Sequence, residues 1–172
     1  MPKHWKLLIA FLAVFGLIAA SCGDDDDGDS ADDGDSGSAL VTLEEDCAAL
    51  FDGVEAPEDF RVGLVTDIGK VDDGTFNQFA HEGALGALEC FGIPEDNYSV
   101  IETVSEADYE ANIATTLEAD PDVVITVGFL IADATVAAAQ ANPDVTFIGI
   151  DQFADPYPDN MVGVLFNEDE AG

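Results

Sequence analysis

The stretch that decides the fold is Val65-Thr66-Asp67-Ile68-Gly69-Lys70-Val71-Asp72-Asp73-Gly74-Thr75-Phe76-Asn77-Gln78. It begins within residues 61–66, a short apolar and β-branched run that predicts a buried strand. It leads into residues 75–91, where the helical spacing of apolar residues predicts a helix. The predicted helical stripe contains Phe76, Phe79, Ala80, Gly83, Ala84, Ala87, Leu88 and Phe91. The polar loop between the two elements therefore lies at the carboxyl end of a strand, where open α/β sheets bind small ligands.

Two carboxylates, Asp72 and Asp73, stand just before this helix. A carboxylate at that place accepts hydrogen bonds from the N–H groups of the first turn and complements the helix dipole. We therefore expect one of them to cap the helix, in preference to a carboxylate pair for acid–base chemistry.

The rest of the chain alternates between strand and helix patterns. This alternation, with near-continuous apolar strands, predicts an α/β fold with a doubly wound parallel sheet. Pro94, Pro121 and Pro143 mark the returns from helix to strand. The predicted strands are 61–66, 98–103, 123–127, 146–150 and 161–166, and the predicted helices are 75–91, 106–118 and 131–141.

Polar or aromatic residues follow three of the predicted strands. Each of them alone would be explained as a turn or cap residue, but the carboxyl ends of parallel strands meet at one edge of the sheet. Together with two residues at the start of the first helix, they predict a ligand site. These residues are Asp67, Gly128, Phe129, Asp151, Phe76 and Asn77.

The order of these motifs resembles the basic membrane lipoprotein family, the PnrA-like substrate-binding proteins of ABC transporters, over residues 60–172. Lys70 and Thr75 depart mildly from the pattern. The residues that carry the resemblance are Val65-Thr66-Asp67, Gly69, Asp72-Asp73, Phe76-Asn77, Glu82-Gly83, Val127-Gly128-Phe129, Pro143 to Phe147 and Asp151.

The resemblance implies a type 1 periplasmic-binding fold, a purine nucleoside as the small-molecule ligand and an ABC permease as partner. It implies that Asp67 and Asp151 accept hydrogen bonds from the ligand, that Asn77 offers both a donor and an acceptor, and that Gly128 lets the backbone approach the ligand. The ligand-binding set also includes Asp73, Phe76 and Phe129.

The same resemblance assigns residues 40–172 to the N-terminal lobe of the substrate-binding domain. In the family the chain crosses into a second lobe after a segment like residues 167–172, so we expect the second lobe to be missing here. A cleft with one wall predicts weak ligand binding.

Two roles are open for Phe76. The helical periodicity makes it the first residue of the core stripe, whereas the resemblance places its ring against a nucleobase. The polar neighbours Asp73, Gly74 and Asn77 favour the ligand role.

The N-terminus predicts a signal peptide over residues 1–21. Lys3 and Lys6 precede an apolar run, residues 7–20, that is too short to span a bilayer. Ala19-Ala20-Ser21-Cys22 resembles a bacterial lipobox, which implies acylation of Cys22 and a lipid anchor on the extracytoplasmic face of the cell membrane. An ordinary secretory signal is the alternative.

Residues 22–39 follow as an acidic tether, in which residues 23–38 are Asp, Gly and Ser apart from Ala31 and cannot bury enough apolar surface to fold. Asp25, Asp27 and Asp29 match the first ligands of a calcium loop. Because serines occupy the turn-glycine and bidentate-glutamate positions, Ser30 and Ser36, we expect no metal site.

The charge balance is unusual, with 37 acidic and 4 basic residues among 172. Only Arg61 and Lys70 are basic beyond the signal peptide. Nucleic acid is therefore excluded as a partner, because binding it requires Lys and Arg against the phosphates.

Three cysteines are present. With Cys22 acylated, Cys47 and Cys90 remain in an exported protein, which predicts a disulfide between them, with two free thiols as the alternative. Such a bond contributes about 2–4 kcal/mol in the chain-entropy model.

Enzyme signatures and cofactor motifs are missing from the sequence, and His81 is expected to be solvated. We therefore predict a lipid-anchored, non-enzymatic binding protein of an ABC importer, without a cofactor. The alternatives are a surface lipoprotein for adhesion or signalling and, more weakly, a nucleoside hydrolase.

Overall fold

The computed structural model describes Cys47 and residues 53–166. By its contacts the chain separates into two units, residues 1–40 and 41–172, and every described residue belongs to the second. The predictions for the signal peptide, Cys22, the acidic tether and the calcium-like loop therefore lie outside the described residues. The spacing of Leu43, Cys47 and Leu50 also predicts a short helix within residues 40–56, which lies outside the described residues except for Cys47 and residues 53–56.

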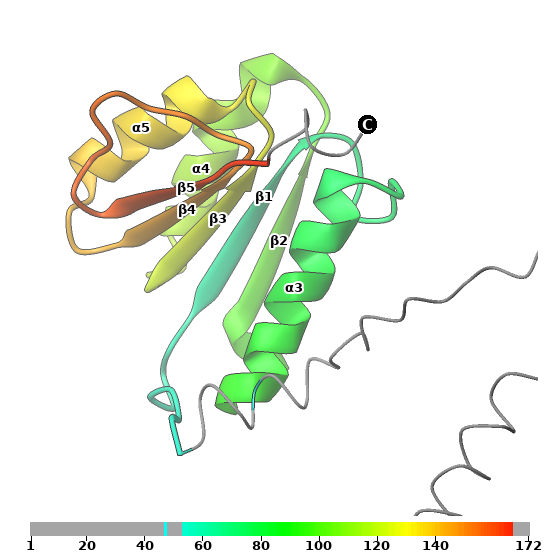
Figure 1. Cartoon of the computed structure of the whole chain (residues 1–172), viewed down its shortest axis with the longest axis vertical. Helices are drawn as coiled ribbons and strands as arrows, with labels where there is room; N and C mark the ends of the chain where they lie inside the picture. Colours follow the sequence, from blue (N-terminus) through cyan, green and yellow to red (C-terminus); the bar gives the residue numbers. More distant parts are fainter. Residues whose placement is uncertain (1–46, 48–52, 167–172) are drawn as a thin grey trace, which may run out of the picture. The chain divides into compact units, whose positions relative to one another are not determined.

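The described part forms a five-stranded parallel sheet with the order β2-β1-β3-β4-β5 (Figure 1). The chain first moves from β1 outward to β2, then crosses back past β1 to β3 and continues to β4 and β5. The direction of winding therefore reverses between β1 and β3, which is the place where sheets of this order hold their ligands. The strands are β1 (Val62–Ile68), β2 (Tyr98–Thr103), β3 (Val123–Val127), β4 (Thr146–Ile150) and β5 (Met161–Val164).

Helices flank the sheet on both faces. Helix α3 packs on one face, against β1 and β3, whereas α4 and α5 contact each other on the opposite face (Figure 1). The predicted doubly wound α/β architecture is therefore confirmed. The helices are α3 (Phe76–Phe91), α4 (Tyr109–Leu117) and α5 (Ala132–Ala141), with short 3-10 turns η1 (Glu95–Asn97) and η2 (Glu106–Asp108).

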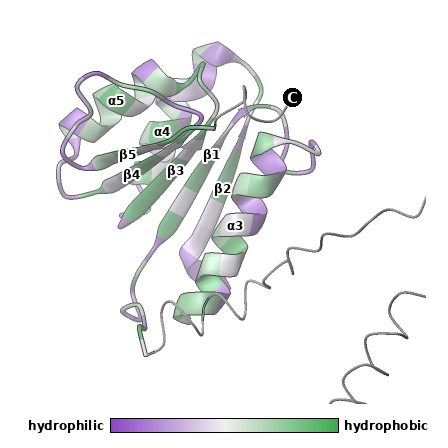
Figure 2. Ribbon diagram, viewed as in Figure 1, coloured by the Kyte–Doolittle hydropathy of each residue, from purple (hydrophilic) through white to green (hydrophobic). Residues whose placement is uncertain are grey.

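Apolar residues fill the space between the sheet and both helical layers, and Figure 2 shows them along the strands. Under α4 and α5 the core contains Val65, Ile113, Val124 and Phe147, all at most 1% exposed. Under α3 it contains Leu64, Ala84 and Leu88 among others. Alternate residues of β1, Leu64 and Val65, thus face opposite layers, as the period of a strand requires.

The outer strand β5 is less covered than the others. Val162 is 57% exposed and Val164 is 36% exposed, although their neighbours Met161 and Phe147 are buried. The reason is that α3 packs against β1 and β3, on the other side of that face of the sheet.

The predicted core stripe of α3 is wrong at its beginning. Phe79 is 64% exposed and Gly83 is exposed, whereas Asn77 is only 3% exposed. The buried face starts one residue later than the apolar pattern predicts, at a polar residue. The reason is a pair of hydrogen bonds made by the Asn77 amide, described below, which fixes the rotation of the helix.

Candidate functional site

The carboxyl ends of three strands lie together at one edge of the sheet. The Gly128 N–H donates to the carbonyl of Ile150 at 2.9 Å, and the Asp151 N–H donates to the carbonyl of Val164 at 2.8 Å. These backbone bonds continue the sheet beyond β3 and β4. They bring Gly128 and Asp151 to the edge where Asp67, within β1, also lies, next to the reversal between β1 and β3.

The carboxylate of Asp67 is held by the protein itself. Its Oδ1 accepts a hydrogen bond from its neighbour, the Ile68 N–H, at 2.7 Å. The same oxygen accepts a hydrogen bond from the Tyr109 hydroxyl, at the start of α4. Burial raises the pKa of the Tyr109 hydroxyl, and the hydrogen bond to Asp67 and the negative charge of that carboxylate raise it further. Tyr109 is therefore a neutral donor at physiological pH.

Gly128 lies directly against the carboxylate of Asp67. Its φ of 88° lies in the left-handed region, and a Cβ at this position would overlap the carboxylate of Asp67. The absence of a side chain therefore makes room for Asp67. That Gly128 also lets the backbone approach a ligand stays a prediction.

Asp73 caps α3, as one of the two acidic residues was expected to do. Its Oδ1 accepts from the backbone N–H groups of Thr75 at 2.8 Å and Gln78 at 3.1 Å. Its Oδ2 accepts from the Thr75 hydroxyl at 2.8 Å and from the Asn77 amide at 2.9 Å. Partial burial raises the pKa of Asp73, but these hydrogen bonds together hold it below the ordinary value of 3.8.

Asn77 connects this cap to β1. Its Oδ1 accepts from the backbone N–H of Asp67 at 3.0 Å, while its Nδ2 donates to Asp73. The side chain is 3% exposed. Both polar atoms of the amide are thus engaged within the protein, so the structure gives Asn77 the task of joining the first helix to the first strand.

Phe76 stays outside the hydrophobic core. It is 40% exposed, and its ring lies 5.4 Å from the ring of Phe166, centre to centre. Of the two roles considered for Phe76, the core position is therefore wrong. The ring lies at the sheet edge, next to a residue that follows β5.

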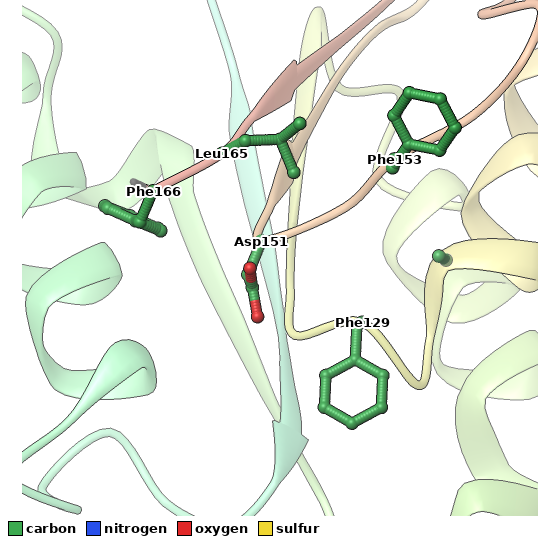
Figure 3. Close-up of a pocket in the computed structure, with 6 residues that line it drawn as sticks. Phe129, Asp151, Phe153, Leu165 and Phe166 are labelled. Atoms are coloured by element: carbon green, nitrogen blue, oxygen red, sulfur yellow. The ribbon is translucent and has the colours of Figure 1, made fainter. Parts of the chain in front are cut away.

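An open pocket of about 520 Å³ surrounds Asp151 (Figure 3). Asp151 has a φ of 57°, and its carboxylate has no hydrogen-bond partner among the described residues. Exposed aromatic rings stand around it, with Phe129 67% and Phe153 65% exposed. The pocket combines one unpaired carboxylate with several apolar surfaces. Its lining consists of Phe129, Ala132, Asp151, Phe153, Leu165 and Phe166.

Gln152, beside Asp151, is a residue that the sequence did not single out. It is fully buried, and its Nε2 donates to the hydroxyl of Thr126 at 3.0 Å and to the carbonyl of Thr126 at 3.2 Å. The Tyr157 hydroxyl donates to the Gln152 carbonyl at 2.9 Å. These contacts hold the backbone next to Asp151 in place. A buried glutamine cannot be told from an exposed one by spacing alone, so the sequence carried no signal for it.

Four residues that line the pocket were also not singled out from the sequence, namely Ala132, Phe153, Leu165 and Phe166. Phe153, Leu165 and Phe166 come after strands and could have been noticed as apolar residues in otherwise polar loops. Leu165 and Phe166 were instead assigned to the last strand, which ends earlier, at Val164.

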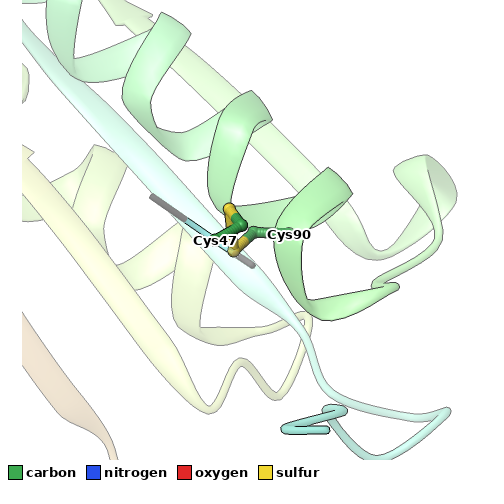
Figure 4. The surroundings of a disulfide bond; sticks show 2 residues. All are labelled: Cys47 and Cys90. Carbon is green, nitrogen blue, oxygen red and sulfur yellow. A yellow bond between two sulfur atoms is a disulfide. The ribbon is translucent and has the colours of Figure 1, made fainter. Parts of the chain in front are cut away.

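The sulfur atoms of Cys47 and Cys90 are bonded, with their Cα atoms 5.6 Å apart (Figure 4). The bond joins Cys47 to the last turn of α3, at the opposite end of the helix from the cap residue Asp73.

His81 is half-buried, and its Nδ1 lies 2.9 Å from the Tyr98 hydroxyl. The expectation that His81 is solvated is therefore wrong, because its ring stacks on Tyr98.

No group of metal-ligating side chains is found within Cys47 and residues 53–166. In the same part of the chain, no helix has the length and apolar character needed to cross a membrane.

Two curated proteins are similar to this chain in sequence. The chain is 30% identical over 170 residues to the CD4+ T-cell-stimulating antigen of Listeria innocua, covering 98% of this chain and 42% of that protein. It is 30% identical over 119 residues to the ABC transporter nucleoside-binding protein BmpA of Lactococcus lactis, covering 66% of this chain and 32% of that protein. The chain therefore spans less than half the length of these curated relatives.

A solved ABC transporter solute-binding protein from Aeropyrum pernix superposes with a TM-score of 0.56 at 28% identity, over 64% of this chain and 30% of that chain. The model of the Bmp family, described as ABC transporter substrate-binding protein PnrA-like, matches residues 60–172. This match confirms the resemblance over the residues where the sequence motifs placed it. The chain belongs to the Bmp family of PnrA-like ABC transporter substrate-binding proteins.

Proposed function

We propose that this protein is a lipid-anchored solute-binding protein of an ABC importer and that it binds purine nucleosides. The observation that carries the proposal is the pocket around Asp151, with its unpaired carboxylate and exposed aromatic rings at the reversal edge of the sheet. Family membership supports the role in solute capture. The Lactococcus lactis relative, which is named a nucleoside-binding protein, supports the ligand class.

The chemistry of the pocket suits a flat, uncharged molecule that carries hydroxyl or amino groups. A carboxylate accepts hydrogen bonds from such donors, and aromatic rings stack on a base. Neither of the two described basic residues lines the pocket. Arg61 instead donates to the carbonyl of Ala119 at 3.0 Å. A phosphate would therefore meet acidic groups without a compensating cation, so we expect nucleosides to be preferred over nucleotides.

The exposure of the residues that line the pocket limits how tightly this chain can bind a ligand. Phe129, Phe153, Leu165 and Phe166 are each at least half exposed, so these residues surround only part of a ligand. Tight small-molecule sites bury most of the ligand surface. We therefore expect weak binding by this chain and tighter binding by a protein of the length of its relatives.

We also propose that Cys22 carries the lipid and holds the protein at the extracytoplasmic face of the cell membrane. Two or more acyl chains anchor a protein stably, whereas a single chain does not. The test is membrane fractionation of cells that express the wild type or Cys22→Ser. Release of the variant into the soluble fraction is expected, and equal membrane retention would refute the anchor.

The ligand proposal is tested by calorimetry and thermal unfolding with adenosine, guanosine and adenosine monophosphate. The nucleosides should raise the melting temperature by mass action, and the nucleotide should have little effect. Asp151→Asn is the matched variant, because it keeps the shape of the side chain and removes its charge. A chain that binds neither nucleoside would refute the proposal and favour the adhesion or signalling alternative.

The non-enzymatic role needs its own control. Chromatography of adenosine after long incubation with the protein should show intact nucleoside. Release of adenine and ribose would support the nucleoside hydrolase alternative instead.

A further inference from the structure

We propose that Tyr109 is a positioning residue that fixes the carboxylate of Asp67 in the orientation that receives the ligand. The inference rests on the proposed function, because it gives a role to a side chain that supports the same sheet edge. The apolar pattern of α4 accounts for the burial of the Tyr109 ring in the core. It does not account for the presence of a hydroxyl group on that ring.

The ring and the hydroxyl of Tyr109 have separate surroundings. The ring is 5% exposed and belongs to the core under α4 and α5, together with Val65 and Ile113. The hydroxyl instead donates a hydrogen bond to Oδ1 of Asp67, which lies 42 residues earlier in the chain. A phenylalanine would fill the core equally well. The polar atom is therefore the part of the residue that packing does not require.

The two oxygens of the Asp67 carboxylate become unequal through this contact. Oδ1 accepts two hydrogen bonds, from the Ile68 N–H and from Tyr109. Oδ2 lies against the backbone of Gly128 and accepts none within the described part of the chain. One oxygen is thus occupied by the protein, and the other remains available as an acceptor.

Asp67 is held from both helical layers at once. Asn77 of α3 accepts from its backbone N–H at 3.0 Å, while Tyr109 of α4 binds its side chain from the opposite face of the sheet. A carboxylate on a strand without the second contact could rotate about its side-chain bonds. Fixing such a group before the ligand arrives lowers the entropic cost of binding.

The orientation has a chemical consequence for the ligand. An ionised carboxylate only accepts hydrogen bonds, so Asp67 selects a ligand atom that carries a hydrogen. Tyr109 remains protonated because burial and Asp67 both raise its pKa. The pair therefore keeps the same hydrogen-bond direction over the physiological pH range.

The test compares Tyr109→Phe with Tyr98→Phe in the whole chain. Tyr98 is the matched control, because its hydroxyl also has a side-chain partner, His81, but lies outside the site. We expect Tyr109→Phe to melt near the wild type and to weaken adenosine binding about tenfold, the size expected for a hydrogen bond to a charged group. Tyr98→Phe should bind adenosine like the wild type. In an Asp67→Asn background, Tyr109→Phe should cause no further loss.

A second measurement needs no ligand. The ¹³C resonance of the Asp67 carboxyl carbon should move in ligand-free Tyr109→Phe and stay in place in Tyr98→Phe. If adenosine fails to bind the wild type, the proposed function fails, and this resonance alone decides the positioning of Asp67. An unchanged resonance overturns the proposal. So does normal adenosine affinity in Tyr109→Phe, or an equal loss with and without the Asp67 carboxylate.

Discussion

Asp67 and Asp151 lie at the same edge of the sheet, but the protein treats them differently. Asp67 is tied to Tyr109 and Ile68 through its carboxylate and to Asn77 through its backbone. Asp151 has an unpaired carboxylate in an open pocket and a left-handed backbone conformation. Hydrogen bonds within the protein hold both the carboxylate and the backbone of Asp67, whereas at Asp151 they hold only the backbone.

We therefore expect Asp67 to determine the selectivity of the proposed site and Asp151 to let it adapt to different ligands. A side chain with prearranged hydrogen bonds can select the position of one ligand atom. An unpaired side chain among exposed rings can adjust to ligands of different shape. We therefore expect changes near Asp67 to affect both folding and binding, and changes at Asp151 to affect binding almost alone.

The largest effect is expected for Gly128→Ala. The new methyl group would overlap the Asp67 carboxylate, and φ at this residue is positive, at 88°. Together these should lower the free energy of unfolding by about 3 kcal/mol, measured in urea. Gly92→Ala is the control, with a φ of 67° and open space around the site of the methyl group, and should cost about 1 kcal/mol. Equal losses of stability in the two variants would show that the Asp67 side chain can move aside for the new methyl group at little cost.

Asn77→Ala should come next. It removes a buried amide that joins Asp67 to Asp73, and it leaves the Asp67 N–H without that acceptor. We expect a loss of about 2 kcal/mol in the free energy of unfolding, together with weaker adenosine binding. Asn112→Ala removes a half-buried amide that makes one bond, to Thr103, and should cost about 1 kcal/mol without changing binding. Normal binding by Asn77→Ala would contradict the role of this bridge.

Phe76→Ala distinguishes a packing role of the ring from a ligand-binding role. A fully buried phenylalanine costs about 3–5 kcal/mol when truncated. Phe76 is 40% exposed, so we expect a stability loss of about 1 kcal/mol and a larger loss in binding, roughly 1–3 kcal/mol. Phe79→Ala, on the same helix at 64% exposed, is the control and should bind normally. A Phe76 variant that melts far lower yet binds adenosine normally would refute the stacking role.

Asp151→Gly should hardly change stability. Glycine relieves the left-handed backbone but is more flexible in the unfolded chain, so the net change should stay within about 1 kcal/mol. Adenosine binding should fall at least about tenfold, as for a lost hydrogen bond to a charged group. Asp120→Gly is the control, since Asp120 also has a positive φ, 54°, but lies before β3. Its adenosine affinity should equal that of the wild type, and an equal loss in both variants would argue against a contact at Asp151.

The smallest effect is a pH dependence at Asp73. Because its pKa in the folded protein lies below the ordinary value of 3.8, its contribution to stability is complete above that value. The contribution is lost as the pH falls through the folded-state pKa. Asp73→Asn should therefore lose less stability than the wild type on acidification below about pH 4 in urea titrations. Asp72→Asn, whose side chain makes none of the capping bonds, should follow the wild type.

Local patterns in the sequence were sufficient to predict the sheet and the edge at which Asp67, Gly128 and Asp151 lie. The β-branched runs gave strands that match the structure within about two residues. Their place before the helix marked Asp72 or Asp73 as the cap, and the structure assigns it to Asp73. Asp67, Gly128 and Asp151 were recognisable because the ends of parallel strands meet at one edge. These properties depend on neighbours along the chain and on general rules of topology.

Contacts between distant residues were decided only by the tertiary structure. The helical periodicity alone placed Phe76 and Phe79 on the core face of α3, but the bridge from Asn77 to β1 turns that helix so that both rings are exposed. Tyr109 reads as a core residue, and its hydroxyl meets Asp67 only because α4 begins beside the end of β1. Gln152 is buried only because the chain turns inward after β4. Periodicity assigns a residue to a face, whereas the partner of a polar atom depends on which other face is packed against it.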